Sequence, residues 1–211
     1  MLFAKRLETM NRSEIKKYYT EKFSKFGATA RGVDWEDENS QRLRFRILSE
    51  IGDLQGASVL DVGCGNGEML QWFSRQGLRV AYTGIDMADS MIQFAQKRYG
   101  DKGTFLQGDI LEAELKPVDY CFASGTFHVK GAAGHEEWFA YVKDALTRMF
   151  NLSRRGMAVN FMTSFVDYRE DHLFYLSPYD LLHFSMSELT RSITLRHDYP
   201  LWEYAAYFYR L

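Results

Sequence analysis

The feature that most constrains the fold of this chain is a glycine-rich segment, VLDVGCGNGE, at residues 59–68. A short apolar run at 58–62 leads into it, and a run with helical spacing follows it. An apolar run closed by glycines is typical of a buried parallel strand. Glycines between a strand and a helix allow a tight turn and let a ligand approach bare backbone. The spacing is GxGxG, which differs from both the GxGxxG of dinucleotide sites and the P-loop.

Strand-like and helix-like segments alternate along the rest of the chain. Apolar runs predict buried strands at 58–62, 80–86, 104–107, 118–123 and 157–162. Helical spacing predicts helices at 13–26, 36–51, 68–76, 89–99, 135–152 and 177–189. Two last strands, at 193–199 and 203–211, are joined by too few residues for a crossover helix and predict an antiparallel hairpin.

This alternation predicts an α/β fold with a mostly parallel seven-stranded sheet and helices on both faces. The antiparallel hairpin closes the sheet at the C-terminal end. We expect residues 1–55 to form an N-terminal helical cap or lid, and residues 56–211 to form the ligand-binding domain.

Acidic residues follow the first three predicted strands. Asp61 lies at the mouth of the glycine loop, where it would repel a pyrophosphate but suits a ligand carrying an ammonium or a sulfonium. Asp86 ends the second strand, where α/β nucleotide sites place an acid that accepts bonds from ribose hydroxyls. Asp109 ends the third strand and could accept a bond from an adenine amino group, with Ile110 against the ring.

With these features in this order, residues 58–162 resemble the class I, Rossmann-like S-adenosylmethionine-dependent methyltransferases. The segments 168–172 and 196–200 look like a bacterial subgroup of unknown substrate. The resemblance implies that the glycine loop holds the methionine part of the cofactor, the second acid the ribose, and the residues after the third strand the adenine. The residues that it assigns to the cofactor are Asp61, Gly63, Cys64, Gly65, Gly67, Asp86, Met87, Asp109, Ile110 and Ser124.

Two departures narrow the kind of methyltransferase. The exit of the fourth strand lacks Asn/Asp-Pro-Pro-Tyr, which argues against amino methylation of nucleic-acid bases. The chain also lacks a convincing trio of metal-binding acids of the kind found in catechol-type enzymes, so we expect no metal.

Three polar residues are candidates for the substrate side. His128 lies just past the fourth strand, at the edge where ligands of open α/β sheets bind, and is our first candidate for a general base. The alternative is a loop histidine bonded to backbone. His172 or one of the acids in the same loop is the second candidate base, and Arg169 could bind a carboxylate or phosphate of the substrate. His172 and Arg169 belong to a charged run at residues 169–172, and the plainer interpretation of this run is a solvated loop or a salt-bridge cluster.

Aromatic residues precede the sheet, among them Tyr19 and Trp35. They either pack on the domain or form a lid over cofactor and substrate, where aromatic faces attract a sulfonium by about 0.5–2 kcal/mol. We expect Tyr19 and Trp35 to contact the substrate. Arg44, on the second predicted helix, could face the carboxylate of the cofactor.

Composition excludes several classes of protein. The 211 residues include 26 Lys and Arg against 28 Asp and Glu, so we expect no nucleic-acid partner. Cys64 and Cys121 form no CxxC or Cys/His cluster, which disfavours a disulfide framework or a zinc site. No apolar run is long enough to cross a bilayer, and residues 1–8 lack the apolar core of a signal peptide. We therefore expect no membrane partner and a cytoplasmic location.

These observations predict an enzyme, a transferase that uses S-adenosylmethionine and releases S-adenosylhomocysteine. We expect methylation of an oxygen or nitrogen of a small metabolite by direct displacement. The alternatives are a methyltransferase acting on a protein or RNA, and a non-catalytic S-adenosylmethionine-binding regulatory module. The identity of the acceptor, the choice between oxygen and nitrogen, the need for a base and the oligomeric state stay open.

Overall fold

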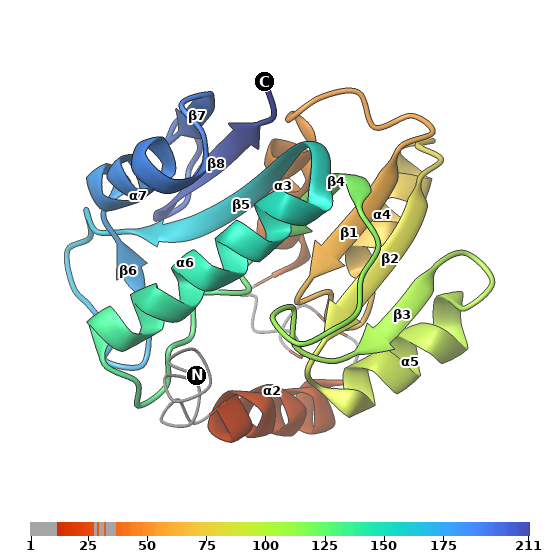
Figure 1. Cartoon of the computed structure of the whole chain (residues 1–211). Helices are drawn as coiled ribbons and strands as arrows, with labels where there is room; N and C mark the ends of the chain where they lie inside the picture. Colours follow the sequence, from red (N-terminus) through yellow and green to blue (C-terminus); the bar gives the residue numbers. More distant parts are fainter. Residues whose placement is uncertain (1–11, 28, 30–31, 33–36) are drawn as a thin grey trace.

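Eight strands form one mixed sheet in the part of the chain that the computed structural model describes, residues 12–27, 29, 32 and 37–211 (Figure 1). They are β1 (Ser58–Val62), β2 (Ala81–Asp86), β3 (Thr104–Gln107), β4 (Val118–Ala123), β5 (Ser153–Thr163), β6 (Tyr175–Leu176), β7 (Ile193–Arg196) and β8 (Glu203–Tyr209). Their order is β3-β2-β1-β4-β5-β8-β7, with β6 paired to β5. Because β8 is antiparallel to both β5 and β7 while the other pairs are parallel, the predicted sheet with its C-terminal hairpin is confirmed.

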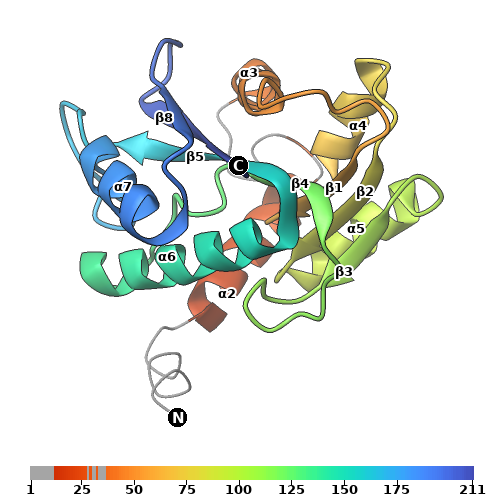
Figure 2. The same cartoon turned by 45° about the horizontal axis from the view of Figure 1, so that its top comes forward.

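Helices cover both faces of this sheet, as Figure 2 shows. They are α2 (Arg12–Phe26), α3 (Glu38–Ser49), α4 (Glu68–Arg75), α5 (Asp89–Tyr99), α6 (His135–Leu152), α7 (Pro178–Phe184) and the π-helix η2 (Ser185–Leu189). The buried side chains of α3, α4 and α5 share one hydrophobic core, and those of α6 and α7 share the other. Successive residues of a strand point to opposite faces, so β8 sends Ala205 and Tyr207 into the first core and Tyr204, Ala206 and Phe208 into the second.

The two described N-terminal helices have different positions. Phe45, Ile47 and Leu48 of α3 are buried in the same core as α4 and α5, so α3 packs against the sheet itself. By contrast, α2 lies across the end of the sheet toward which β1 and β2 point (Figure 1). It contacts α5, where the rings of Phe23 and Phe94 meet edge to face at 5.6 Å. Of these two helices, α2 therefore has the position of a cap.

The structure corrects the predicted strand count and several boundaries. The sheet has an eighth strand, β6, whose two residues are too few to carry an alternating pattern. β5 begins at Ser153, directly after α6, and not at the predicted residue 157. The prediction was too short because Arg154 and Arg155 near the start of the strand are exposed and polar. The predicted helix at 177–189 is α-helical only to Phe184 and continues as a π-helix.

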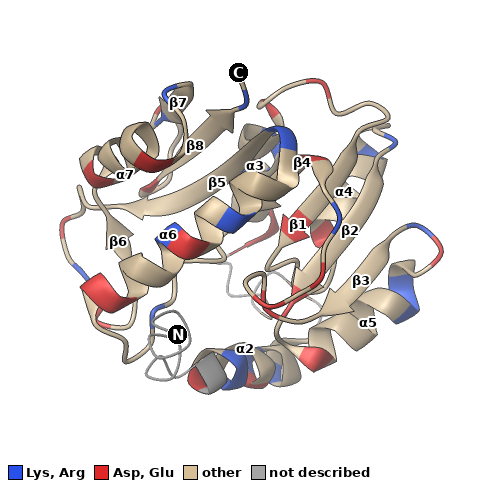
Figure 3. Cartoon of the chain, in the orientation of Figure 1, with Lys and Arg blue, Asp and Glu red and all other residues tan. Residues whose placement is uncertain are grey.

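The described helices were also compared in length, apolar character and charge. None of the helices that the structure describes combines the length and the apolar character that a membrane crossing requires. Figure 3 shows basic and acidic residues side by side on α2, so the cap presents mixed charge rather than a single sign.

Candidate functional site

A cavity of about 500 Å³ opens at the carboxyl ends of β1, β2 and β4. Small-molecule sites commonly enclose about 300–1,000 Å³. The strand order reverses between β1 and β4, which is where open α/β sheets bind ligands. The predicted residues that line the cavity are Tyr19, Asp61, Gly63, Cys64, Gly65, Asp86, Met87, Asp109, Ile110, Ser124, His128 and His172.

The glycine loop is held against β2 by backbone hydrogen bonds. The N–H groups of Gly63 and Cys64 both donate to the carbonyl of Ile85, at 2.8 and 3.1 Å. Gly63 has φ +71°, and a Cβ at this position would lie 2.6 Å from the side chain of Thr126. Only glycine meets both conditions without strain. The loop therefore exposes backbone to the cavity at the place where the spacing predicts it.

Gly67 has a packing role and is not among the residues that line the cavity. It precedes α4 with φ +84°, and a Cβ there would lie 3.0 Å from the ring of Phe105 and 3.1 Å from that of Tyr99. Glycine therefore lets the start of α4 approach the neighbouring strand and helix. Its predicted contact with the cofactor stays a prediction.

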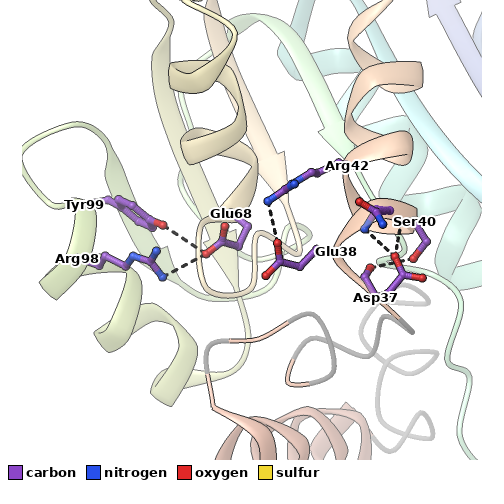
Figure 4. A network of polar contacts seen from close by, with 8 residues as sticks. Asp37, Glu38, Ser40, Arg42, Glu68, Arg98 and Tyr99 are labelled. Atoms are coloured by element: carbon purple, nitrogen blue, oxygen red, sulfur yellow. Dashed lines mark hydrogen bonds and ion pairs between the residues drawn. The ribbon is translucent and has the colours of Figure 1, made fainter.

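Polar contacts fix the helix ends around the loop (Figure 4). Glu68, the first residue of α4, accepts hydrogen bonds from Arg98 at 3.2 Å and from the Tyr99 hydroxyl at 3.3 Å, which ties α4 to α5. Asp37 caps α3 by accepting from the backbone N–H groups of Asn39 and Ser40 at 2.6 and 2.9 Å. Both helix starts are thus anchored beside the cavity.

Asp86 connects the loop to the end of β2. Its Oδ2 accepts from the Gly65 N–H at 2.9 Å, and its Oδ1 accepts from the Ala88 N–H at 2.8 Å. Burial raises the pKa of this carboxyl, and the hydrogen bonds from Ala88 and Gly65 lower it in part. Each carboxylate oxygen can accept more than one bond, so Asp86 is oriented toward the cavity and can still accept from hydroxyls.

Asp61 is the more perturbed of the two acids. It is 2% exposed, and its Oδ2 accepts from the Tyr82 hydroxyl at 2.5 Å. Burial raises the pKa of the Asp61 carboxyl to about 7, against the hydrogen bond from Tyr82, and the nearby charge of Asp86 raises it further. A positively charged group brought into the cavity would relieve this repulsion. The electrostatics of the loop therefore favour a cationic ligand.

Other buried polar atoms line the same half of the cavity. Asn66 Nδ2 and Ser124 Oγ are buried without a hydrogen-bond partner. Such atoms call for an explanation, and a bound ligand supplies one. Asp109 is buried and accepts from the Leu111 N–H at 2.8 Å, beside the buried Ile110. Asn66 is a residue that the sequence analysis did not select, although it lies inside the glycine loop.

Cys64 is not suited to nucleophilic chemistry. Its sulfur lies where a Cβ on Gly84 would approach to 2.7 Å, so the side chain fills the space that this glycine leaves. Burial raises the pKa of the Cys64 thiol well above its usual value, and the charges of Asp86 and Asp61 raise it further. The thiol is therefore protonated and inert at neutral pH.

The opposite half of the cavity is lined by His128, Arg44 and Glu203. Arg44 Nε donates to both carboxylate oxygens of Glu203 at 2.9 Å, and Arg44 Nη2 also donates to Oε1. Arg44 is thus bound to a protein carboxylate, and its predicted approach to the carboxylate of a cofactor stays a prediction. Glu203, the first residue of β8, was not selected from the sequence, where it looks like an ordinary strand residue.

The remaining candidates differ in whether the structure places them at the cavity. The ring of Tyr18 lies 5.3 Å from that of Tyr19 and 6.4 Å from that of His172, so α2 reaches the loop before β6. Arg169 is exposed outside the cavity lining, and its Nη2 donates to the Ser164 carbonyl at 3.2 Å. Trp35 lies outside the described residues.

Metal ligation finds no support in the described part of the chain. No group of three or more His, Cys, Asp or Glu side chains there is arranged to hold a metal ion.

Comparison with known proteins gives a consistent family. A family model described as a methyltransferase domain matches residues 59–149. A Mycobacterium tuberculosis protein named "Putative methyltransferase Rv1506c" is 33% identical over 150 residues, which cover 70% of this chain and 89% of that protein. A malonyl-[acyl-carrier protein] O-methyltransferase of Hamiltonella defensa is 24% identical over 159 residues, which cover 74% of this chain and 54% of that protein. The chain thus spans about half the length of this second relative.

Solved structures agree in fold. Magnesium protoporphyrin IX methyltransferase from Synechocystis PCC 6803, solved with bound S-adenosylmethionine, superimposes with a TM-score of 0.59 at 16% identity. The match covers 80% of this chain and 79% of that one. At this identity the likeness concerns the arrangement of strands and helices.

Proposed function

Because the chain belongs to the class I S-adenosylmethionine-dependent methyltransferases, we propose that it transfers the methyl group of S-adenosylmethionine to an oxygen or nitrogen of a small metabolite. The observation that carries the proposal is the pairing of a bare glycine loop with two carboxylates of raised pKa, the buried Asp61 and the half-buried Asp86. The carboxylates favour a ligand that carries positive charge and hydrogen-bond donors. A ligand with an ammonium, a sulfonium and ribose hydroxyls has both.

The described residues fit S-adenosylmethionine in its parts. Asp61 would pair with the ammonium, and the backbone of Gly63 and Gly65 leaves room for the methionine chain. Asp86 would accept from the ribose hydroxyls, while Asp109 and Ile110 would meet the adenine. Asn66 Nδ2 and Ser124 Oγ, which are buried without partners, would gain hydrogen bonds.

When bound, S-adenosylmethionine supplies a methyl group already activated by a positively charged sulfur. The chain then has to place the acceptor in line and exclude water, which can be worth about 7–11 kcal/mol. The cap helix α2 suits the second task, since Ile15, Tyr18 and Tyr19 line the cavity from the side opposite the strand ends. We therefore propose that α2 acts as the lid over donor and acceptor, with Tyr19 against the acceptor.

A small acceptor is supported by the size of the site. A cavity of about 500 Å³ has to hold the donor and the reacting part of the acceptor together. The name of the Hamiltonella defensa relative, malonyl-[acyl-carrier protein] O-methyltransferase, gives an acceptor that is attached to a protein. A small reacting group on a large carrier is therefore a second possibility for this chain. The experiment below separates these two cases.

Binding of S-adenosylhomocysteine tests the donor half of the site by calorimetry. Asp86→Asn removes the charge from a carboxylate that would accept from two hydroxyls, at about 1.5–3 kcal/mol for a bond to a charged group. We expect a loss of about tenfold to 150-fold in affinity. Asp89→Asn is the matched control, because Asp89 is exposed on α5 and bonds to Gln93 outside the cavity. Equal affinity of both variants would contradict the assignment of Asp86.

Transfer of a radiolabelled methyl group into cell extract, separated by molecular mass, tests the acceptor class. Label in the low-mass fraction supports a metabolite. Label in protein or RNA would move the acceptor to a macromolecule. Tight binding of S-adenosylhomocysteine with no labelled product in any fraction would favour a non-catalytic module instead.

A further inference from the structure

We propose that Glu203, clamped by Arg44 and Asn160, positions His128 as the base that takes a proton from a hydroxyl of the acceptor. The inference rests on the proposed function, because a base has a role only if a methyl group is transferred. It adds a residue from β8 and one from α3 to the acceptor side of the site, and it specifies the kind of acceptor.

The first support is the way in which Glu203 is held. Its carboxylate is 4% exposed and accepts two bonds of 2.9 Å from Arg44 Nε, with a further bond from Arg44 Nη2. Asn160 on β5 donates from Nδ2 to Oε2 at 2.5 Å. Three elements, α3, β5 and β8, thus fix one carboxylate at the wall of the cavity. A bidentate contact with arginine orients a carboxylate more strictly than a single bond does.

The second support is a hydrogen-bonded path from Glu203 to the turn that carries His128. Asn160 binds Glu203 through Nδ2 and accepts through Oδ1 from the Gly125 N–H at 2.8 Å. The Gly125 carbonyl then accepts from the His128 N–H at 3.2 Å, and the His128 carbonyl accepts from the Phe174 N–H at 2.7 Å. The backbone around His128 is therefore fixed by the same amide that holds the acid.

The third support is electrostatic. Burial raises the pKa of the Glu203 carboxyl, but the charges of His128 and Arg44, together with the bonds from Arg44 and Asn160, lower it below its usual value. Glu203 is thus ionised, and its charge interacts with the imidazole of His128. A carboxylate near an imidazole favours the protonated ring, which is the form that a base reaches when it accepts a proton.

Other titratable or charged groups face the same half of the cavity. They come from α2, α6 and the loop before β6 and comprise Lys16, Tyr18, Tyr19, Lys22, Tyr141 and His172. The cations Arg44, Lys16 and Lys22 oppose a positive charge on His128, whereas Glu203 is the acid that supports it from β8. Asp61, Asp86, Asp109 and Glu68 line the cavity as well.

Transfer of the methyl group to a hydroxyl balances with the groups already described. The acceptor oxygen forms the new bond to the methyl carbon, and the bond between that carbon and sulfur breaks with its electron pair going to the sulfur. The hydroxyl proton goes to the imidazole of His128, and the ring later releases it to water. Glu203 keeps its charge throughout and acts only through His128.

This arrangement favours a hydroxyl over a carboxylate as the acceptor. A carboxylate is already a nucleophile and needs no base. A neutral hydroxyl, by contrast, needs the proton acceptor that His128 supplies.

The test is an NMR titration of the chain with 13C at the histidine Cε1, without any ligand added. The His128 signal is assigned by its loss in His128→Gln. We expect its titration midpoint to fall by about one pH unit or more in Glu203→Gln, since an opposite charge nearby shifts a pKa by about 1–3 units. The His172 signal and the variant Glu50→Gln serve as controls, because Glu50 pairs with Arg196 on the exposed surface.

A second variant guards against misfolding, because Glu203→Gln leaves Arg44 buried without its acid. The double change Arg44→Met with Glu203→Met removes both charges and can keep the packing. Its His128 midpoint should lie at least about one pH unit below that of the single variant Arg44→Met, which lacks the same cation but keeps the Glu203 charge, while binding of S-adenosylhomocysteine is retained. An unchanged midpoint in folded Glu203→Gln, or equal midpoints in Arg44→Met and the double variant, would overturn the proposal.

A kinetic cycle completes the test, with the low-mass extract fraction as the methyl acceptor. Glu203→Gln should slow transfer by about tenfold or more and move the acidic limb of the pH–rate profile to lower pH. In the His128→Ala background the same change should cost less than about twofold, since Glu203 acts through His128. If the unaltered chain transfers no methyl group, the proposed function fails, while the NMR titration still decides whether Glu203 acts on His128.

Discussion

Replacing Gly63 by alanine separates two reasons for which the loop needs glycine. The first is backbone conformation, since Gly63 has φ +71° and a left-handed L-residue costs about 1–2 kcal/mol. The second is space, because the new Cβ would lie 2.6 Å from both Oγ1 and Cγ2 of Thr126. Thr126 cannot easily turn away, since its hydroxyl donates to the Val62 carbonyl at 2.7 Å. Overpacking of this kind adds about 1–3 kcal/mol.

The expected sum is a loss of about 2–5 kcal/mol in the free energy of unfolding, measured by urea denaturation. Gly77→Ala is the matched control, since Gly77 has φ +73° and nothing lies within 4 Å of a Cβ there. It should lose only the conformational part and should keep its affinity for S-adenosylhomocysteine. Gly63→Ala should lose affinity as well, because the loop has to move. Equal losses of stability in the two variants would refute the steric part of the reasoning.

Two further predictions concern charge. The pKa of Asp61 is raised by burial to about 7, so between about pH 4 and 7 the folded chain keeps a proton that the unfolded chain has released. The contribution of Asp61 to the free energy of unfolding should therefore fall with rising pH in that window, by at most about 1.4 kcal/mol per pH unit. Asp61→Asn should reduce the dependence of this free energy on pH, measured by urea denaturation at several pH values. The same pH dependence in both proteins would contradict the prediction. Arg44→Met should cost about 3–5 kcal/mol of stability because it leaves Glu203 buried and unpaired, whereas Arg42→Met on the same helix breaks only an exposed pair with Glu38 and should cost less than about 1 kcal/mol. Similar midpoints of urea unfolding for the two would count against a buried role for Arg44.

Local patterns were sufficient for most of the fold. β1, β3, β4 and α6 have the predicted bounds, because each is a continuous apolar run or a clear helical stripe ended by glycine or polar residues. β6 escaped prediction since two residues carry no period. β5 was predicted too short, because Arg154 and Arg155 near its start are exposed and lie where its pairing with β4 shifts register.

The part of the cavity around the glycine loop could be predicted for a geometric reason. In a parallel sheet the carboxyl ends of neighbouring strands meet at one edge, so residues that directly follow strands come together. Asp61, Asp86, Asp109 and Ser124 each stand at or just after such an end, and all four line the cavity. Position relative to a strand was enough to bring them together, with no need to know which helix packs where. Arg169 also follows a strand, yet it lies six residues beyond β5 in a loop that turns it outward.

The acceptor half depends on contacts that no local pattern contains. Arg44 and Glu203 are 159 positions apart and meet only because α3 packs against β8, whose neighbour in the sheet is β5. Their buried pairing, once seen, changes the interpretation of His128 from a loop histidine to a ring supported by an acid. On the proposal that Glu203 positions His128, the acceptor side of the cavity depends on the packing of α3 against β8, whereas the glycine loop and its acids depend only on where neighbouring strands end.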